Sequence, residues 1–211
     1  MFLVVGTVIA FVPDSTQWRL REFLSSISSM NNGVTFRHEV QFYLSDSALV
    51  ESFARAVAVA LSSGNAAIVV ATKSHRESLN QKLAGDSLDI DAAIKSGLYI
   101  VQDADEMLSR ILLNDALDRL PLFESLCALV EYAANATKTE RPRVVICGEG
   151  VGILCAGGNL KAAMQIEELC NDLAQLYEVE ILCAYPLNSV EEQDSNAQER
   201  IAALHTASYH G

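Results

Sequence analysis

One stretch of the sequence decides the fold: Arg143–Pro186, which reads RVVICGEGVGILCAGGNLKAAMQIEELCNDLAQLYEVEILCAYP. Its first apolar run, 144–147, is rich in β-branched residues and is typical of a strand buried on both faces. Behind Asn159, a favoured helix cap, apolar residues recur at helical spacing up to Tyr177. A second short apolar run ends at Pro186. Two buried strands joined by a helix predict a βαβ unit and therefore a parallel sheet.

The same alternation of strands and helices continues outward over His38–Pro186. Further strands are predicted at Glu39–Tyr43, Ala66–Ala71 and Leu98–Val101. Helices are predicted from Ser45 or Asp46 to Gly64, from a Ser74–Glu77 capping box to about Leu83, from Asp89 to Gly97, from a box at Asp103–Glu106 to Leu112, and from Pro121 as first helical residue. Asn188–Asn196 reads as a loop and Ala197–Tyr209 as a last helix. The fold class is therefore α/β, with a mostly parallel sheet and helices on both faces.

The N-terminal part of the chain is set apart by composition. Phe2–Val12 is apolar but far shorter than the roughly 20 residues of a membrane helix. Thr16–Ile27 has a weak amphipathic pattern, and Ser25–Gly33 reads as a linker. We expect residues 1–35 to form an appendage and 36–211 a single domain. Met30 offers an alternative start, which would leave residues 1–29 outside the native protein.

The composition restricts the partners. The chain has 211 residues and a net charge of −12, which argues against direct nucleic-acid binding and against anionic membrane surfaces. Its five cysteines include no CxxC pair, and no Cys/His cluster has zinc spacing. We expect these cysteines to be buried in a cytoplasmic protein without disulfides, membrane span, metal or cofactor.

Three common catalytic motifs are missing. The segment after the first predicted strand, Leu44–Leu49, lacks the glycines and the lysine of a phosphate-binding P-loop. At Gly148–Ile153 the third glycine of a dinucleotide fingerprint is replaced, and Glu149 would repel the pyrophosphate. No G-x-S-x-G nucleophile elbow occurs. We therefore expect no catalytic residues and no enzymatic activity.

Ligands of parallel sheets bind beyond the carboxyl ends of the strands, and Glu149 stands at such an end. Thr72, His75 and Arg76 follow another strand in a helix-opening turn, whose cations and hydroxyls suit an anion. The alternatives are a solvated capping turn and, for Glu149, a cap or an ion pair with Arg76 or Arg143. Further residues expected at the same rim are Tyr43, Tyr185 and Asn159, each as core or pocket wall.

Several short motifs in fixed order resemble one known family. They are His38-x-x-x-Phe42-Tyr43, Asp46, Thr72-x-x-His75-Arg76-x-x-Leu79, Gly148-Glu149, Gly158-Asn159-x-x-Ala162-Ala163-x-x-x-Glu167 and Cys183-Ala184-Tyr185-Pro186. Together they resemble the MEDS domain, the methanogen/methylotroph sensory domain of DcmR-type regulators, over roughly His38–Tyr209. The stretch Ala202–Thr206 matches the family's closing helix only loosely, so we expect no role for the C-terminal histidines.

The resemblance implies a RecA/KaiC-like three-layer fold with degraded nucleotide motifs and a sensory function. The ligand would be a small molecule such as a hydrocarbon derivative, and the output would pass to a partner chain such as a histidine kinase or transcription regulator. The ligand-binding residues it implies are His38, Tyr43, Asp46, Thr72, His75, Arg76, Glu149, Asn159 and Tyr185. Two alternatives stay open: a RecA-like domain with residual nucleotide binding or weak ATP hydrolysis, in which Glu149 orients water, and a homo-oligomeric assembly module.

Overall fold

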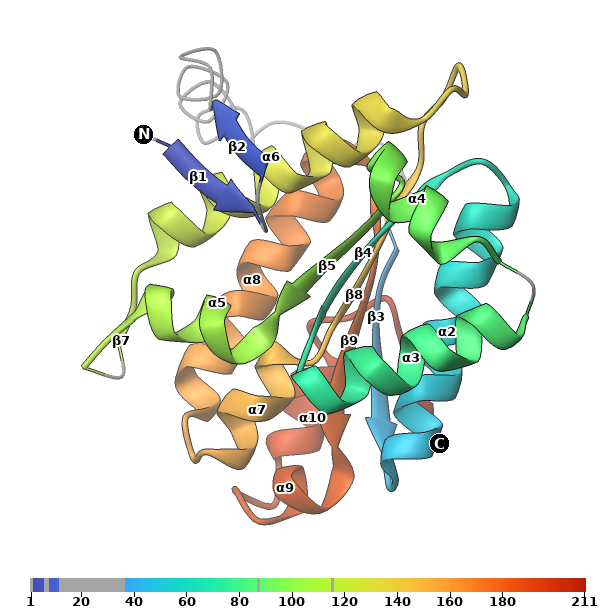
Figure 1. Ribbon diagram of the computed structural model, residues 1–211. Helices are drawn as coiled ribbons and strands as arrows, with labels where there is room; N and C mark the ends of the chain where they lie inside the picture. Colours follow the sequence, from blue (N-terminus) through green and yellow to red (C-terminus); the bar gives the residue numbers. More distant parts are fainter. Residues whose placement is uncertain (1, 6–7, 12–36, 87, 115) are drawn as a thin grey trace.

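The computed structural model describes residues 2–5, 8–11, 37–86, 88–114 and 116–211 (Figure 1). Near the N-terminus, β1 (Phe2–Val5) and β2 (Val8–Phe11) pair as an antiparallel hairpin. The predicted amphipathic segment Thr16–Ile27 and linker Ser25–Gly33 lie outside the described residues. The domain boundary near residue 36 therefore stays a prediction.

The main sheet has six strands in the order β10-β3-β9-β8-β4-β5, and all its strand pairs are parallel. The strands are β3 (Arg37–Tyr43), β4 (Ala66–Ala71), β5 (Tyr99–Asp103), β8 (Val144–Gly148), β9 (Glu180–Pro186) and β10 (Ala207–His210). Every residue of β4 is buried, as its continuous apolar run predicts. The predicted parallel α/β sheet is confirmed.

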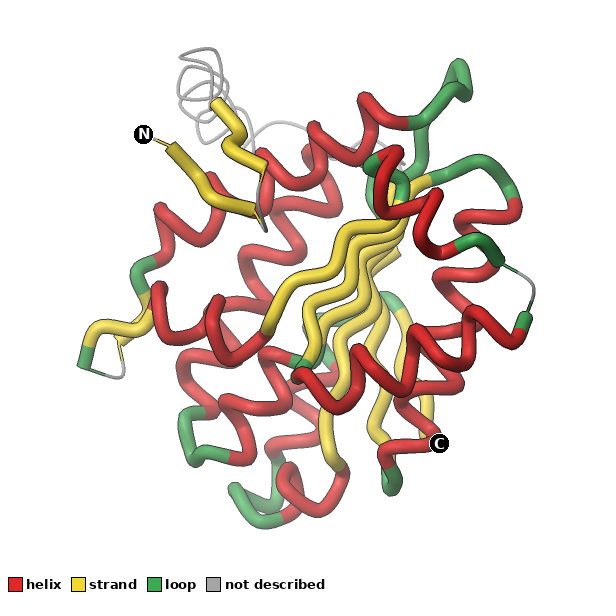
Figure 2. The backbone as a smooth tube through the Cα atoms, viewed as in Figure 1, coloured by secondary structure: helices red, strands yellow, loops and turns green. Residues whose placement is uncertain are grey.

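Helices cover both faces of this sheet (Figure 2). One face carries α2 (Asp46–Ser62), α3 (Lys73–Gly85) and α4 (Ile90–Ser96). The other carries α5 (Ala104–Ile111), α6 (Arg119–Ala136), α7 (Gly150–Ala156), α8 (Leu160–Tyr177), α9 (Leu187–Glu191) and α10 (Ala197–Ala202). A two-residue pair, β6 (Leu112–Leu113) with β7 (Ala116–Leu117), leads into α6. The result is a three-layer α/β/α arrangement with one hydrophobic core on each face.

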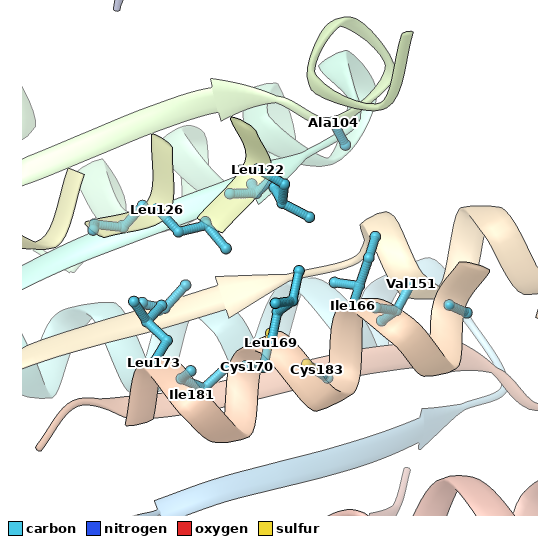
Figure 3. Packing of buried hydrophobic residues seen from close by; sticks show 14 of the residues in the cluster. Ala104, Leu122, Leu126, Val151, Ile166, Leu169, Cys170, Leu173, Ile181 and Cys183 are labelled. Atoms are coloured by element: carbon cyan, nitrogen blue, oxygen red, sulfur yellow. The ribbon is translucent and has the colours of Figure 1, made fainter. Parts of the chain in front are cut away.

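The larger core lies between α6, α8 and the sheet (Figure 3). Leu122 and Leu126 of α6 face Ile166 and Leu169 of α8, and all four are at most 7% exposed. Burying a side chain of this size stabilises the fold by about 1.5–3 kcal/mol. This packing places α8 against the strands, which matters because α8 carries Glu167, a fully buried carboxylate.

Several helix boundaries differ from the prediction. Helix α3 begins at Lys73 behind Thr72, so the predicted Ser74–Glu77 capping box is wrong and those residues lie inside the helix. Pro121 is the third residue of α6 rather than the first, because Asp118 takes the cap position. The predicted loop Asn188–Asn196 is partly wrong, since α9 extends through its first residues.

The C-terminal prediction is also partly wrong. The last helix ends at Ala202, and Ala207–His210 instead forms β10, which pairs with β3 from Glu39 to Phe42. The open edge of β3 offers unpaired backbone groups, and satisfying them outweighs the local helical pattern.

The glycine-rich segment after β8 forms the short helix α7. A side chain at Gly152 would overlap the carbonyl oxygen of Ala184 and lie 2.9 Å from the Pro186 ring. Glycine is therefore required for α7 to approach the end of β9 so closely.

The connections also create a topological switch point. The chain leaves β4 into α3 on one face of the sheet, while it leaves the neighbouring β8 into α7 on the opposite face. In open parallel sheets, the crevice at the carboxyl ends of two such strands is the usual ligand position. Thr72 follows β4 and Glu149 follows β8, so both lie at this switch point.

Candidate functional site

Residues from three strand ends meet at this edge of the sheet. Asp46 opens α2 after β3, His75 lies in the first turn of α3 after β4, and Glu149 follows β8. His75 Nδ1 lies 2.7 Å from Glu149 Oε2, and its Nε2 lies 3.4 Å from Asp46 Oδ1. We call Asp46, His75 and Glu149 the rim triad.

Glu149 is the fixed member of the rim triad. It is 2% exposed, and its Oε1 accepts a hydrogen bond of 2.5 Å from the backbone N–H of Thr72. Burial raises the pKa of Glu149, but the hydrogen bonds from His75 and Thr72 outweigh it and hold the pKa below its ordinary value. An ionised carboxylate therefore occupies the positive end of the α3 dipole.

His75 is held between two carboxylates. The hydrogen bond to Glu149 raises the pKa of His75, burial opposes this, and the charges of Glu149 and Asp46 add to the rise. The imidazolium form is favoured, so both ring nitrogens carry a proton that a carboxylate oxygen accepts. The rim triad then carries one positive and two negative charges. Asp46 is the exposed member of the rim triad, because its side chain is 83% accessible.

The neighbouring cation is also paired. Arg76 forms an ion pair with Asp103 at the end of β5, and its Nε donates 3.1 Å to the carbonyl oxygen of Ala71. Tyr43 is buried nearby on the α2 face of β3, where burial, Glu149 and Asp46 raise its pKa. The carboxyl edge of the sheet is thus a network of polar groups that mostly satisfy one another.

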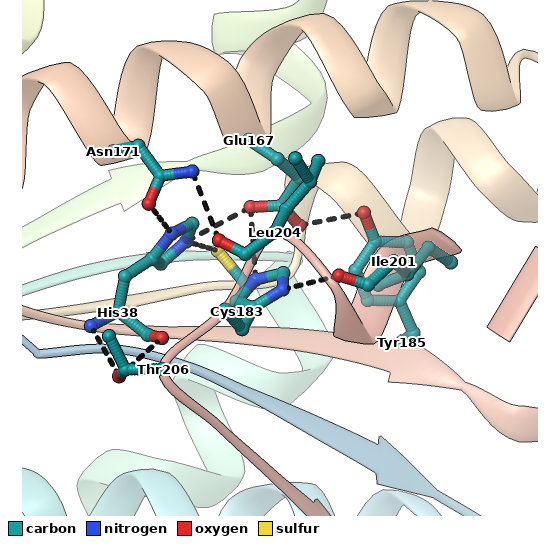
Figure 4. A network of polar contacts seen from close by, with 9 residues as sticks. His38, Glu167, Asn171, Cys183, Tyr185, Ile201, Leu204 and Thr206 are labelled. Carbon is teal, nitrogen blue, oxygen red and sulfur yellow. Dashed lines mark hydrogen bonds and ion pairs between the residues drawn. The ribbon is translucent and has the colours of Figure 1, made fainter. Parts of the chain in front are cut away.

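A second polar cluster lies within the α8 face of the sheet (Figure 4). It consists of His38 on β3, Glu167 on α8, Cys183 on β9 and His205 after α10, and we call it the interior cluster. The side chains of both histidines and of Glu167 are 0% exposed, and Cys183 is 3% exposed. Glu167 Oε2 lies 3.1 Å from His38 Nε2 and 3.3 Å from His205 Nε2.

Neighbouring groups hold the interior cluster in place. Tyr185 donates its hydroxyl to Glu167 Oε1 at 2.7 Å, and Asn171 Oδ1 lies 3.0 Å from His38 Nδ1. Burial raises the pKa of Glu167, but His205 and His38 outweigh it and hold the pKa far below its ordinary value. Burial lowers the pKa of His38, whereas hydrogen bonds to Cys170 and Glu167 raise it to about 10. The cluster is therefore built around a buried carboxylate anion.

A family model for the MEthanogen/methylotroph, DcmR Sensory domain, abbreviated MEDS, matches residues 37–206. The match covers most of the 211-residue chain and agrees with the predicted resemblance. The chain belongs to the MEDS family. It therefore carries a sensory domain. No curated protein matches the chain.

Both polar clusters lie within the matched part of this MEDS domain. In the part of the chain that the structure describes, no helix is long and apolar enough to cross a membrane. The five cysteines are all free and buried, as predicted.

The structure sorts the nine predicted site residues of the MEDS domain into separate places. Those at the carboxyl edge are Tyr43, Asp46, Thr72, His75, Arg76 and Glu149. His38 and Tyr185 belong instead to the interior cluster and its support. The side chain of Asn159 caps α8 by accepting from the N–H of Ala162 at 3.1 Å. The predicted pairing of Glu149 with an arginine is replaced by its bond to His75.

A groove of about 790 Å³ opens along the α2 face of the MEDS domain, beside β3, β9 and β10. Its size suits a small organic ligand. Gln41 lines it and is 5% exposed, and its Oε1 has no hydrogen-bond partner among the described residues. Val59 of α2 also lines the groove and is 63% exposed. The groove offers a second place where a ligand could bind.

Sequence reasoning missed several of these residues. Gln41 lies within a predicted strand, and nothing in the sequence indicates that its side chain lines a groove rather than packing in the core. Cys183 and His205 lie far from His38 in sequence, so no metal-like spacing links them. Asp103 was predicted as a helix cap, which the structure confirms, since it accepts from the N–H of Glu106. Its second role, as the partner of Arg76, depends on strand neighbours that the sequence does not reveal.

Proposed function

We propose that this MEDS domain binds a small, uncharged hydrocarbon derivative at the carboxyl edge of its sheet and passes the signal to a partner chain, such as a histidine kinase or a transcription regulator. The observation that carries the proposal is the rim triad, in which side chains from three strand ends meet at a topological switch point.

The charges at the rim favour an uncharged ligand. The Thr72–Arg76 turn holds three cations. His75 is paired with two carboxylates and Arg76 with Asp103, and the exposed Lys73 lies 3.9 Å from Glu77. Glu149 already occupies the N-terminal end of α3, where an external anion would otherwise bind. An added anion would meet an excess of negative charge, whereas a hydroxyl or carbonyl group could accept the proton of His75 Nε2.

The rim triad also supplies a route for the signal. His75 Nε2 forms an ion pair at 3.4 Å with Asp46, the first residue of α2, which is largely exposed. A ligand oxygen that accepts from Nε2 replaces Asp46 and releases the first turn of α2. Binding then shifts the population between two positions of that turn, provided that the ligand has different affinities for them. A partner that contacts the start of α2 would detect the change.

We further propose that the domain is a RecA/KaiC-like scaffold that has lost nucleotide hydrolysis. The segment Leu44–Asp46 after β3 has neither glycine nor lysine to hold phosphates. Both carboxylate oxygens of Glu149 are already engaged, by His75 and by Thr72, so neither is free to orient an attacking water. We expect phosphate release from Mg-ATP to stay at the buffer rate and to be the same in Glu149→Gln. A rate above buffer that this variant abolishes would instead support the enzyme.

A thermal-shift screen tests the sensor. Short alcohols, aldehydes, ketones and halogenated one-carbon compounds are compared with small carboxylates and nucleotides. We expect uncharged compounds to raise the melting temperature of the wild type and of His210→Gln, a control at an exposed histidine that lines the groove rather than the rim, but not of His75→Gln. The proposal fails if no uncharged compound stabilises the wild type.

A groove variant locates the ligand. Val59→Trp enlarges a side chain that lines the groove, and no residue of the rim triad lines it. Under the rim proposal, Val59→Trp keeps the ligand response that His75→Gln loses. The opposite pattern, with the response lost in Val59→Trp and kept in His75→Gln, places the ligand in the groove and overturns the rim site.

A further inference from the structure

The interior cluster brings together four different ligand-type side chains. His38, Glu167, Cys183 and His205 each offer one ligand atom, and these atoms all lie within 4.8 Å of one another. Metal–ligand bonds of about 2.0–2.3 Å in a tetrahedron separate the ligand atoms by about 3.3–3.8 Å. The observed separations of 3.1 Å and 3.3 Å from Glu167 Oε2 to the two histidine Nε2 atoms are already close to this range.

The Nδ1 atoms of His38 and His205, which face away from the centre of the cluster, each contact an oxygen atom of a neighbouring residue. His205 Nδ1 lies 2.7 Å from the backbone carbonyl oxygen of Ile201, which can only accept, so Nδ1 carries the proton. His38 Nδ1 lies 3.0 Å from Asn171 Oδ1, and Asn171 is oriented by its own donation to the carbonyl of Leu204. In the neutral form, both Nε2 lone pairs then point toward the centre of the cluster. Histidines that bind metals are held in this way.

The centre of the cluster contains unsatisfied polar atoms. Glu167 Oε2 and His205 Nε2 have no partner in hydrogen-bond geometry among the described residues, although they lie 3.3 Å apart. The other oxygen, Glu167 Oε1, is satisfied by Tyr185. Leaving buried polar atoms without partners destabilises the folded state. A cation between Glu167, both Nε2 atoms and the sulfur of Cys183 would satisfy all of them.

We propose that His38, Glu167, Cys183 and His205 form a buried site for a divalent transition-metal ion, of which zinc fits best. Two neutral imidazoles, one carboxylate and one thiolate balance a charge of +2. The mixture of nitrogen, oxygen and sulfur ligands suits zinc rather than the harder magnesium or calcium ions. Binding ionises the Cys183 thiol and removes the second proton of His38, and both released protons pass to solvent.

The site has a structural character. All four ligands come from the protein, so no open position is left for a substrate. The ion would tie β3, α8 and β9 to the segment after α10, where Thr206 also bonds His38 through its hydroxyl and its backbone N–H. It would therefore lock the C-terminal segment onto the sheet.

The first test uses the wild-type full chain. We expect elemental analysis of protein purified without added metal or chelator to find close to one equivalent of zinc. After chelation, Co²⁺ added to the apoprotein should give the visible bands of a tetrahedral ion and a near-ultraviolet thiolate charge-transfer band. The proposal is overturned if the apoprotein binds neither Zn²⁺ nor Co²⁺. The cluster is then an internal ion-pair network only.

Matched variants assign the ligands. Cys183→Ala and His205→Gln should lower the zinc content at least tenfold, whereas Cys147→Ala, a buried cysteine elsewhere, and His210→Gln should keep it. If the ligand variants fail to fold, the thiolate charge-transfer band of the wild type still decides whether a cysteine binds the ion. A wild-type zinc content in folded Cys183→Ala would overturn the site.

The metal proposal goes beyond the sensor proposal, and its failure is distinguishable. The rim triad and the interior cluster share no residue. Metal content and cobalt spectra test the interior cluster. The ligand-induced thermal shift, compared between the wild type and His75→Gln, tests the rim triad.

Discussion

At the scale of single residues, His75 shows how one strong and one weak contact can make a responsive site. Its bond to Glu149 is short and buried, whereas its contact with Asp46 is longer and exposed. Ion pairs at exposed positions contribute little stability, so the Asp46 end can be exchanged for a ligand at small cost. The Glu149 end keeps the imidazole in position while this happens.

The rim triad predicts a pH dependence. The pKa of His75 is raised, so its contribution to stability is fully present below its ordinary value of 6.5 and is lost as the pH rises through the folded-state value. The pKa of Glu149 is lowered, so its contribution is present above 4.5 and is lost as the pH falls through its folded-state value. Together they stabilise the fold most between these two ordinary values.

We therefore expect His75→Gln to lower the free energy of unfolding by about 1–2 kcal/mol at about pH 5.5, with a smaller loss toward alkaline pH. Urea unfolding of both proteins over a series of pH values measures this. His210→Gln serves as the control and should follow the wild type at each pH. A loss in His75→Gln that does not change with pH would show that the imidazolium plays no part.

At the scale of elements, helix α8 depends on its first turn. Asn159 caps it, and α8 then presents Leu169 and Leu173 to the core and Glu167 to the interior cluster. Asn159→Ala should cost about 0.5–2 kcal/mol of stability, because the N–H of Ala162 loses its acceptor. Asn159→Asp should restore most of the loss, since aspartate is an equally good cap.

Chemical denaturation measures this cost, and the ligand screen adds a second readout. Both Asn159 variants should keep the wild-type response to ligands, because the residue acts through the helix rather than at the rim. If the ligand-induced thermal shift disappears in both variants although they fold, Asn159 is part of the ligand-binding site.

Elements with local signals could be predicted from the sequence. The apolar run of β4 and the Asp89–Gly97 caps of α4 were predicted correctly, the latter with Gly97 in the left-handed conformation at φ 79°. Strand β10 could not be predicted, because its conformation depends on the free edge of β3. The rim was predicted in part, since strand ends share one edge. The interior cluster was not predicted, because its members are distant in the sequence and meet only through the packing of β3, α8 and β9.

At the scale of the whole molecule, the six strands of the main sheet that the structure describes all lie within residues 37–210. A chain that begins at Phe36 is therefore expected to unfold cooperatively at the same denaturant concentration as the full chain. Denaturation of both chains measures this. A markedly less stable shorter chain would show that residues 1–35 belong to the folded unit.

The same pair of chains addresses the assembly alternative. Sizing by light scattering compares their masses in solution. A full chain that self-associates while the shorter chain stays monomeric assigns that role to the N-terminal stretch.

The contact between Thr206 and His38 spans 168 positions of the sequence. During synthesis β3 leaves the ribosome long before Thr206 and β10 have been made. The edge of β3 therefore stays unpaired until translation is nearly finished. A slow last step of maturation follows from this order.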